Sequence, residues 1–216
     1  MHADGNSKDL QSTIDRYGKD AGALTCIASH HLASPGKRTR SKLLFAASPT
    51  LQDSSLVHAA AAIELIHEAS IVHDDIQDRT EKRRGQPTVW HKYGANAALL
   101  LGDHLVAAAF RAIAEYPFPA SVQGPLLATL SQAVSRAASG QHLQLATNIH
   151  SRDLLTVYRE VARHKTGAFI ALPLQFAAIL AQADMAASAH ARRCGEQLGL
   201  AYQILDDLRP YAMPAT

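Results

Sequence analysis

The chain has 216 residues, of which 47% are hydrophobic and 19% are charged. This composition is typical of a folded globular protein and excludes an intrinsically disordered chain. The formal net charge at pH 7 is only +2, which argues against the broad basic surface of a nucleic-acid-binding protein. We therefore expect one domain over residues 1–216 and no nucleic-acid partner.

The sequence gives no indication of export or of a membrane span. Residues 1–20 are polar and mixed in charge, without the apolar stretch of a signal peptide. Residues 166–183 approach the length of a membrane helix, but Pro173, Gln175 and Gln182 interrupt them and their alanines are only weakly apolar. We expect a buried helix there and a cytoplasmic protein.

The expected secondary structure is helical throughout. Alanine and leucine dominate, and no run of alternating valine, isoleucine, threonine and aromatic residues predicts a strand. Glycines and prolines divide the chain into segments. The expected helices cover residues 9–32, 37–48, 53–79, 95–115, 125–146, 152–182 and 185–208. The sequence therefore predicts an all-α bundle around a shared core.

An acidic cluster lies in the segment HEASIVHDDIQDRTEKRRGQPT, residues 67–88. At about 100° per residue, a helix brings the following side chains onto one stripe: Glu64, His67, Ser70, Asp74 and Asp78. Asp75 is rotated away and is expected to reach this stripe only obliquely. A solvated acidic face is the alternative interpretation. The apolar flanks and the repulsion of like charges one turn apart favour a bound cation, and hard oxygen ligands favour Mg²⁺ with substrate phosphates completing its shell.

A second acidic pair and several basic groups complete the pattern. In GLAYQILDDLRPY, residues 199–211, Gln203, Asp206 and Asp207 follow helical spacing inside an apolar helix. The basic groups are Lys37, Arg38, Arg40, Arg83, Arg84 and Lys165. Arginine binds phosphate through a bidentate fork and lysine through a point charge. Acidic clusters for metal together with free bases predict a site for diphosphates.

These segments, in their order, resemble the signature segments of the trans-type isoprenyl diphosphate synthases, in particular the geranylgeranyl and polyprenyl diphosphate synthases. The segments that carry the resemblance are GKRTR (36–40), residues 67–88, LLLGDHLVAAAF (99–110), GQHLQL (140–145), HKTGAF (164–169) and YQILDD (202–207). The resemblance implies an antiparallel helical bundle around a central cavity, the type I isoprenoid synthase fold, and a homodimer. It also implies that the last helices of the usual domain are absent from this chain.

The resemblance further implies a reaction and a set of roles. An allylic diphosphate would ionise with the help of Mg²⁺, and the double bond of isopentenyl diphosphate would attack the resulting carbocation. The implied catalytic residues are Asp74, Asp75, Asp78, Arg83, Lys165, Gln203, Asp206 and Asp207, among which Asp74, Asp78 and Asp206 would bind metal. The implied ligands of the isopentenyl diphosphate group are Lys37, Arg38, His67 and Arg84.

Product length is expected to depend on the residues just before the first aspartate motif. Ala69 and Ser70, five and four residues before Asp74, are both small. The resemblance therefore implies an open tunnel and a product of C20 or longer.

The second motif departs from the family pattern at Pro210, where a third aspartate is expected. This proline is expected to end the helix that carries Asp206 and Asp207. One alternative is therefore a truncated or non-catalytic subunit that a partner chain completes. Another is a terpene cyclase on the same fold, although such an enzyme has no need of the retained Lys37, Arg38 and Arg84.

Overall fold

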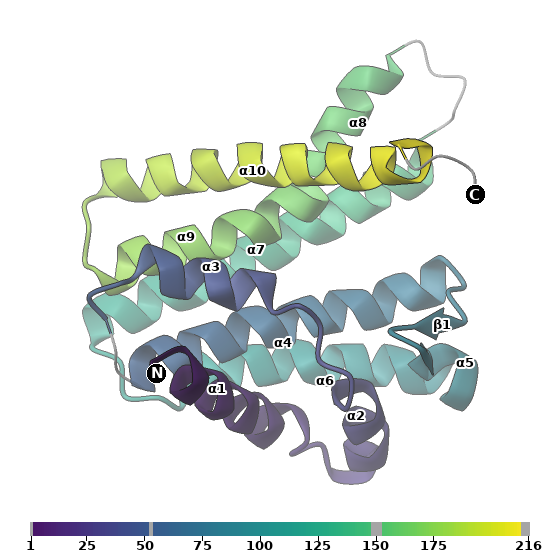
Figure 1. Ribbon diagram of the computed structural model, residues 1–216, viewed down its shortest axis with the longest axis horizontal. Coiled ribbons are helices and arrows are strands. Elements are labelled where there is room, and N and C mark those ends of the chain that lie inside the picture. The colour runs from purple at the N-terminus through teal and green to yellow at the C-terminus, as the bar shows by residue number, and fades with distance from the viewer. Residues whose placement is uncertain (1, 52–53, 148–152, 213–216) are drawn as a thin grey trace. The chain divides into compact units, whose positions relative to one another are not determined.

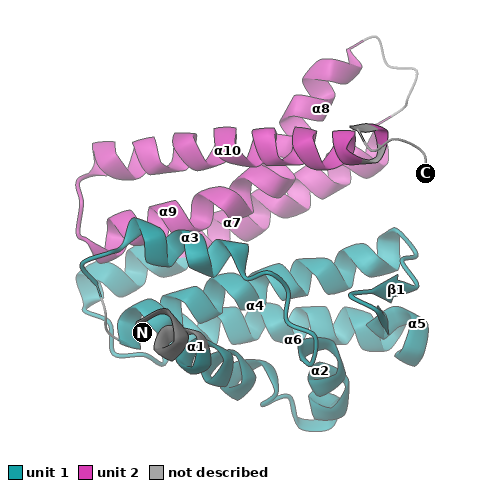
Figure 2. Ribbon diagram, viewed as in Figure 1, with its two compact units in different colours: residues 1–127 teal, residues 128–216 magenta. Residues whose placement is uncertain are grey.

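The computed structural model describes residues 2–51, 54–147 and 153–212. The chain folds as two compact units, residues 1–127 and residues 128–216 (Figure 2). Helices make up most of the described chain, which confirms the all-α prediction. That residues 1–216 act as one domain stays a prediction.

The core of unit 1 is an antiparallel pair of helices, α4 (Ser54–Gln77) and α6 (Ala95–Ala114), which lie side by side (Figure 1). The alanines at positions 59–62 of α4 are fully buried, and such small side chains allow two helices to approach closely. Helix α1 (His2–Gly18) packs on both of them through its apolar face. This core fixes the C-terminal end of α4, where the first aspartate motif lies.

Short elements connect these helices. They are η1 (Gly22–Leu24), α2 (Thr25–Leu32), α3 (Thr39–Ala47), β1 (Lys82–Arg83), β2 (Gln86–Pro87) and α5 (Val89–Tyr93). The prediction of one helix over residues 9–32 was wrong, because α1 ends at Gly18 and the chain turns at Gly22, whose φ of +54° ends a helix. The hairpin is also absent from the prediction, which contained no strand.

The hairpin of β1 and β2 closes through a two-residue turn. Lys82 pairs with Pro87 and Arg83 with Gln86, so Arg84 and Gly85 form the turn. Both have positive φ, 51° and 78°, as the tight turn that suits the twist of antiparallel strands requires.

Unit 2 contains most of α7 (Ala120–Ala146), then α8 (Leu154–Ala162), a π-helical turn (Arg163–Gly167), α9 (Ala168–Leu180) and α10 (Met185–Ala212). Residues 154–180 are continuously helical, close to the predicted 152–182. The prediction that Pro210 ends the last helix was wrong, because α10 runs on to Ala212. A proline this close to a helix end removes few backbone hydrogen bonds.

Helices α9 and α10 are antiparallel neighbours that meet backbone to backbone (Figure 1). A Cβ atom on Gly195 would lie 2.2 Å from the Cα of Ala171, and one on Gly199 would lie 2.5 Å from the Cα of Gly167. Only glycine leaves room for this approach, which fixes the register of α10 one turn before Gln203.

Two of the described helices, α4 and α6, are long and apolar enough to cross a membrane by length and composition alone. In α4, 78% of the apolar window is buried inside the protein, and in α6, 44%. Core helices pass the same test, and α4 is a core helix of unit 1. The segment 166–183 is not one of the two.

Candidate functional site

The first aspartate motif lies at the C-terminal end of α4, and its three members differ in environment. Asp74 is half-buried, Asp75 is only 3% exposed, and Asp78 is exposed just beyond the helix end at Gln77. Asp75 binds Arg83 of the hairpin, with Nη2 2.7 Å and Nε 2.8 Å from Oδ1. The helical spacing correctly separates Asp75 from the stripe, but it does not reveal that this carboxylate faces an arginine.

The hairpin is fastened to the rest of unit 1 at several points. Thr88 Oγ1 and Trp90 Nε1 donate to the carbonyl of Thr80 at 2.7 and 2.8 Å. On the other side, His30 Nε2 lies 2.9 Å from the carbonyl oxygen of Pro87. The tight turn between the strands is therefore held in place, together with the arginines it carries.

The adjacent arginines Arg83 and Arg84 reach different carboxylates of α4. Arg83 binds Asp75, whereas Arg84 Nη1 lies 3.1 Å from Glu68 Oε1. Those two carboxylates are seven residues apart, about 10 Å along a helix. The hairpin thus distributes its two cations along α4.

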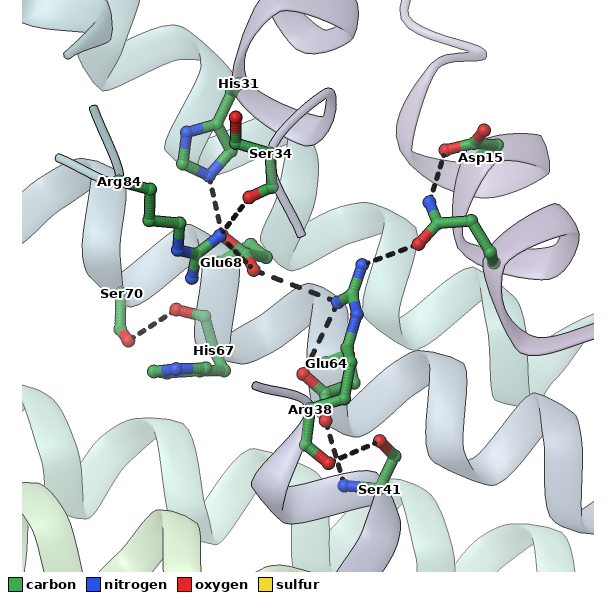
Figure 3. Close-up of polar contacts among 11 residues, drawn as sticks. Asp15, His31, Ser34, Arg38, Ser41, Glu64, His67, Glu68, Ser70 and Arg84 are labelled. Atoms are coloured by element: carbon green, nitrogen blue, oxygen red, sulfur yellow. Dashed lines mark hydrogen bonds and ion pairs between the residues drawn. The ribbon is translucent and has the colours of Figure 1, made fainter. Parts of the chain in front are cut away.

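Glu68 is the centre of a buried ionic cluster (Figure 3). Arg84 is not its only neighbour: His31 Nε2 lies 2.9 Å from Glu68 Oε2, and Arg38 Nη1 lies 3.8 Å from Glu68 Oε1. Arg38 also pairs with the buried Glu64 at 3.4 Å, and Glu64 in turn accepts the backbone N–H of Ser41 at 2.8 Å. Two of the arginines predicted to bind diphosphate are therefore held by buried carboxylates.

This environment changes the titration of two neighbouring groups. Burial alone would raise the pKa of Glu68, but the hydrogen bond and charge of His31, with the charge of Arg84, lower that pKa from 4.5 to about 2. Burial, followed by the positive charge of Arg40, places the pKa of His67 well below its usual 6.5. At neutral pH, Glu68 is therefore ionised and His67 is an uncharged imidazole.

The remaining predicted residues of unit 1 lie around this cluster. Lys37 is exposed in the loop before α3. Ala69 is buried at 1% exposure, and Ser70 is half-buried, with Oγ donating to the carbonyl of His67 at 2.7 Å. The side chain of Ser70 is thus turned back onto its own helix.

Unit 2 contains a cavity of about 380 Å³ that brings together several of the predicted residues. Its lining consists of Gln144, Thr147, Leu154, Val157, Tyr158, Val161, Ala162, Lys165, Thr166, Gln203 and Asp207. Lys165 lies in the π-helical turn, where Nζ is 3.4 Å from Gln144 Oε1 of α7. A Cβ on Gly140 would lie 2.8 Å from the backbone nitrogen of Lys165, so glycine is needed for α7 to approach this turn.

A chain of hydrogen bonds crosses this cavity. Tyr158 donates its hydroxyl to Asp207 Oδ2 at 2.7 Å, and Gln203 Nε2 donates to Oδ1 at 2.9 Å. Thr166 Oγ1 donates to Gln203 Oε1 at 2.6 Å. Burial and the bond to Asp207 raise the pKa of Tyr158 to about 12, so its hydroxyl remains a proton donor.

Asp206 differs from its neighbour. It is not one of the residues that line the cavity, and it pairs with Arg209 at 3.4 Å.

Sequence reasoning missed Tyr158, Thr166, His31 and Glu68. Tyr158 could have been found from its place two helical turns before Lys165, whereas the roles of His31 and Glu68 depend on contacts between distant segments.

The carboxylates of the first motif fit Mg²⁺ by their chemistry. Asp74 and Asp78 are one turn apart and present hard oxygen ligands. Mg²⁺ commonly uses one or two protein carboxylates and completes its shell with water and substrate phosphates. Within the described ranges, no group of three or more His, Cys, Asp or Glu side chains is arranged to hold a metal by itself.

Comparison with known proteins was made at the levels of sequence and structure. The family model described as Polyprenyl synthetase matches residues 22–215. A short chain isoprenyl diphosphate synthase of Methanocaldococcus jannaschii is 30% identical over 93% of this chain and 60% of its own length. A (2E,6E)-farnesyl diphosphate synthase of Mycobacterium tuberculosis is 33% identical over 80% of this chain and 48% of its own length. The chain therefore spans roughly half to three fifths of these relatives.

Solved structures agree with these matches. A geranylgeranyl pyrophosphate synthetase from Geoglobus acetivorans superposes with a TM-score of 0.86 at 29% identity, over 96% of this chain and 69% of that one. A polyprenyl synthase from Caulobacter crescentus, in complex with calcium and isoprenyl diphosphate, superposes with a TM-score of 0.85 at 31% identity, over 98% of this chain and 64% of that one. The predicted isoprenoid synthase fold is confirmed.

Proposed function

The chain belongs to the polyprenyl synthetase family, and we propose that it is an Mg²⁺-dependent trans-prenyltransferase. It condenses an allylic diphosphate with isopentenyl diphosphate to give a longer all-trans prenyl diphosphate. The observation that carries this proposal is the cluster in which Glu68 holds Arg38 and Arg84 a short way up α4 from Asp74 and Asp78. Cations for a diphosphate, held by Glu68 of α4, thus lie near carboxylates for a metal at the C-terminal end of the same helix.

The allylic diphosphate is proposed to bind at the aspartate motifs. In the proposal, Asp74 and Asp78 would hold Mg²⁺ at the first motif and Asp206 would hold it at the second, and the metal would supply positive charge for the departing diphosphate. Arg83 and Lys165 add positive charge, while Gln203 and Asp207 orient the group. Asp75 acts mainly by holding Arg83, which it binds at 2.7 Å.

Isopentenyl diphosphate binds at the cluster of Lys37, Arg38, His67 and Arg84. The arginines offer planar pairs of N–H donors that match phosphate oxygens. Because the pKa of His67 is lowered, its imidazole contributes a neutral hydrogen bond rather than a charge. The C–O bond of the allylic diphosphate breaks, the double bond of isopentenyl diphosphate attacks the resulting cation, and loss of a proton from the new cation gives the product double bond. Apolar walls keep water away from these cations.

The product is proposed to be C20 or longer. Ala69 and Ser70 are small, and neither introduces an aromatic side chain before the first motif. The similar proteins carry names for different products, farnesyl and geranylgeranyl diphosphate, so the proposed length depends on these two residues alone.

The proposed assembly is a homodimer in the cytoplasm. The outward face of α6 carries apolar side chains, and Leu99 and Leu100 are 51% and 55% exposed. On a helix otherwise packed into a core, such a face is suited to the same face of a second copy, as in a two-fold dimer.

One observation favours a second candidate, a subunit that acts only with additional protein. On α10, Leu205, Leu208 and Tyr211 are 67%, 54% and 86% exposed. These apolar side chains flank the second aspartate motif on α10. In this alternative, another polypeptide segment must cover them before the site can turn over.

The test is turnover by the purified chain. It receives Mg²⁺ and labelled isopentenyl diphosphate, with dimethylallyl, geranyl or farnesyl diphosphate in separate reactions, and the dephosphorylated products are sized by chromatography and mass spectrometry. A prenyl alcohol of C20 or longer is expected. A shorter product refutes the proposed length, and no product from folded protein refutes autonomous activity and supports the second candidate.

A further inference from the structure

Glu68 is a buried carboxylate for which the proposed reaction has no direct role. It lies on α4 with 1% of its surface exposed, and side chains from three separate elements converge on it (Figure 3): the imidazole of His31 from α2, and the guanidinium groups of Arg38 from the loop before α3 and of Arg84 from the hairpin turn. We propose that Glu68 is a positioning residue that holds Arg38 and Arg84 ready for the diphosphate of isopentenyl diphosphate. This inference rests on the proposed function and concerns the same site.

The geometry leaves little freedom for these cations. Arg84 Nη1 lies 3.1 and 3.3 Å from the two carboxylate oxygens of Glu68, and it donates to the carbonyl oxygen of Ser34 at 2.7 Å. Arg38 is held by Glu64 as well as by Glu68, and its Nη2 donates to Gln11 Oε1 at 3.0 Å. Each guanidinium is therefore fixed from two or more sides.

The backbone supports the same conclusion. Arg38 and Arg84 both have left-handed backbone conformations, with φ of 53° and 51°. Such a conformation in a residue other than glycine is strained, and it persists where the surrounding structure imposes it. The hairpin turn imposes it on Arg84, and the start of α3 carries it at Arg38, so both side chains leave the backbone from defined positions beside Glu68.

Positioning matters because arginine side chains are flexible. Ordering a free arginine on binding costs side-chain entropy. When Glu68 orders two of them during folding, the substrate no longer has to do so, and its affinity rises. Charge alone acts in the opposite direction, because the negative Glu68 opposes the binding of an anion. When the charge of Glu68 is removed, the loss of positioning should therefore weaken the binding of isopentenyl diphosphate, whereas the loss of negative charge alone should strengthen it.

The test is Glu68→Gln, with binding of isopentenyl diphosphate to the whole chain measured by calorimetry. Glutamine keeps the shape of the side chain, but it has one acceptor oxygen in place of the two carboxylate oxygens that His31, Arg38 and Arg84 approach. Affinity is expected to fall by about tenfold or more. Glu68→Asp, which retains the charge, is expected to recover part of the loss. In an Arg84→Gln background, Glu68→Gln is expected to cause a much smaller loss, because Glu68 acts through that arginine.

A matched control is Glu196→Gln in unit 2. Glu196 also binds two arginines, Arg136 and Arg192, and it has no place in the proposed substrate sites. Unfolding by urea is measured for both variants, so that a general loss of stability is separated from a loss of affinity. Glu196→Gln is expected to leave the affinity within about twofold of the wild type.

If Glu68→Gln does not fold, Gly36→Ala provides the test. A Cβ at Gly36 would lie 2.7 Å from Arg84 Nη2, so this variant displaces the guanidinium without altering the buried carboxylate. Its control is Gly124→Ala, because a Cβ at Gly124 meets no atom within 4 Å. Weaker binding by Gly36→Ala supports the inference, and unchanged binding overturns it.

The outcomes separate the inference from the proposed function. No binding of isopentenyl diphosphate by the wild-type chain overturns the function and the inference together. Equal or tighter binding by Glu68→Gln, with the wild type binding normally, overturns the inference alone.

Discussion

Arg83 binds the buried carboxylate of Asp75 through two nitrogens that share one oxygen, Nη2 at 2.7 Å and Nε at 2.8 Å from Oδ1. The aspartates of the first motif are therefore not equivalent. Asp75 attaches the hairpin to α4, whereas Asp74 and Asp78 lie on the side proposed for Mg²⁺. Helical spacing in the sequence separates Asp75 from the pair expected to bind metal, and the structure shows that the partner of Asp75 is an arginine.

This difference predicts unequal effects on stability. Asp75→Asn removes the charge from a buried group and weakens two hydrogen bonds, so the free energy of unfolding is expected to fall by about 1–3 kcal/mol. Asp78→Asn changes an exposed residue and is expected to alter the free energy of unfolding by less than about 0.5 kcal/mol. Urea unfolding without metal measures both. Equal losses in the two variants would contradict the structural role of Asp75.

The titration of Glu68 predicts a pH dependence of stability. The pKa of Glu68 is lowered from 4.5 to about 2 in the folded chain. A carboxyl with a lower pKa in the folded state stabilises that state above the unfolded pKa and loses this contribution as the pH falls towards the folded pKa. The free energy difference between wild type and Glu68→Gln should therefore shrink by up to about 3 kcal/mol between pH 5 and pH 2. A difference that is constant over this range, in urea titrations, would refute the assigned shift.

His67 is expected to act as a neutral hydrogen-bonding group. Because burial lowers its pKa well below 6.5, His67→Gln should keep the KM for isopentenyl diphosphate within about threefold, whereas His67→Ala should raise it about tenfold. Steady-state kinetics at pH 7 measure both, and the KM for the allylic diphosphate is the internal control. If glutamine is as damaging as alanine, a charged imidazole is required and the prediction fails.

Tyr158 is expected to orient Asp207 for the allylic substrate. Tyr158→Phe removes the donor 2.7 Å from Asp207 Oδ2, so the KM for the allylic diphosphate should rise by about three- to tenfold while that for isopentenyl diphosphate stays the same. Tyr211→Phe, at an 86% exposed position on the same helix as Asp207, is the matched control. Equal changes in both KM values would show a general effect on unit 2 instead.

The helices could be predicted because their signals are local. The alanine-rich run before Glu64 contains no glycine or proline, and the leucines of α6 keep helical spacing around the single glycine Gly102, so both helices appear within a few residues of their expected ends. The break after Gly18 was missed because single glycines are tolerated within helices. Here Gly22, four residues later, has a positive φ, so one continuous helix cannot run from residue 9 to residue 32.

The site could be predicted only in part, since its chemistry is local but its contacts are not. The acidic and basic residue types in their motifs identify a diphosphate site. The pairing of Arg83 with Asp75 requires a hairpin of two-residue strands, which has too few residues for a periodic signal. Similarly, the contact between His31 and Glu68 joins segments that are far apart in sequence, and only folding brings them together.

The most direct test of the central claim is whether prenyl transfer depends on both Mg²⁺ and the first aspartate motif. The wild-type chain and Asp74→Asn are incubated with isopentenyl diphosphate and farnesyl diphosphate, with Mg²⁺ or with a chelator, and product formation is followed over time. We predict product only from the wild type with Mg²⁺, and a rate at least about a hundredfold lower for Asp74→Asn. A rate that is unchanged by the chelator and by the substitution would contradict the account, as would a folded wild-type chain that forms no product.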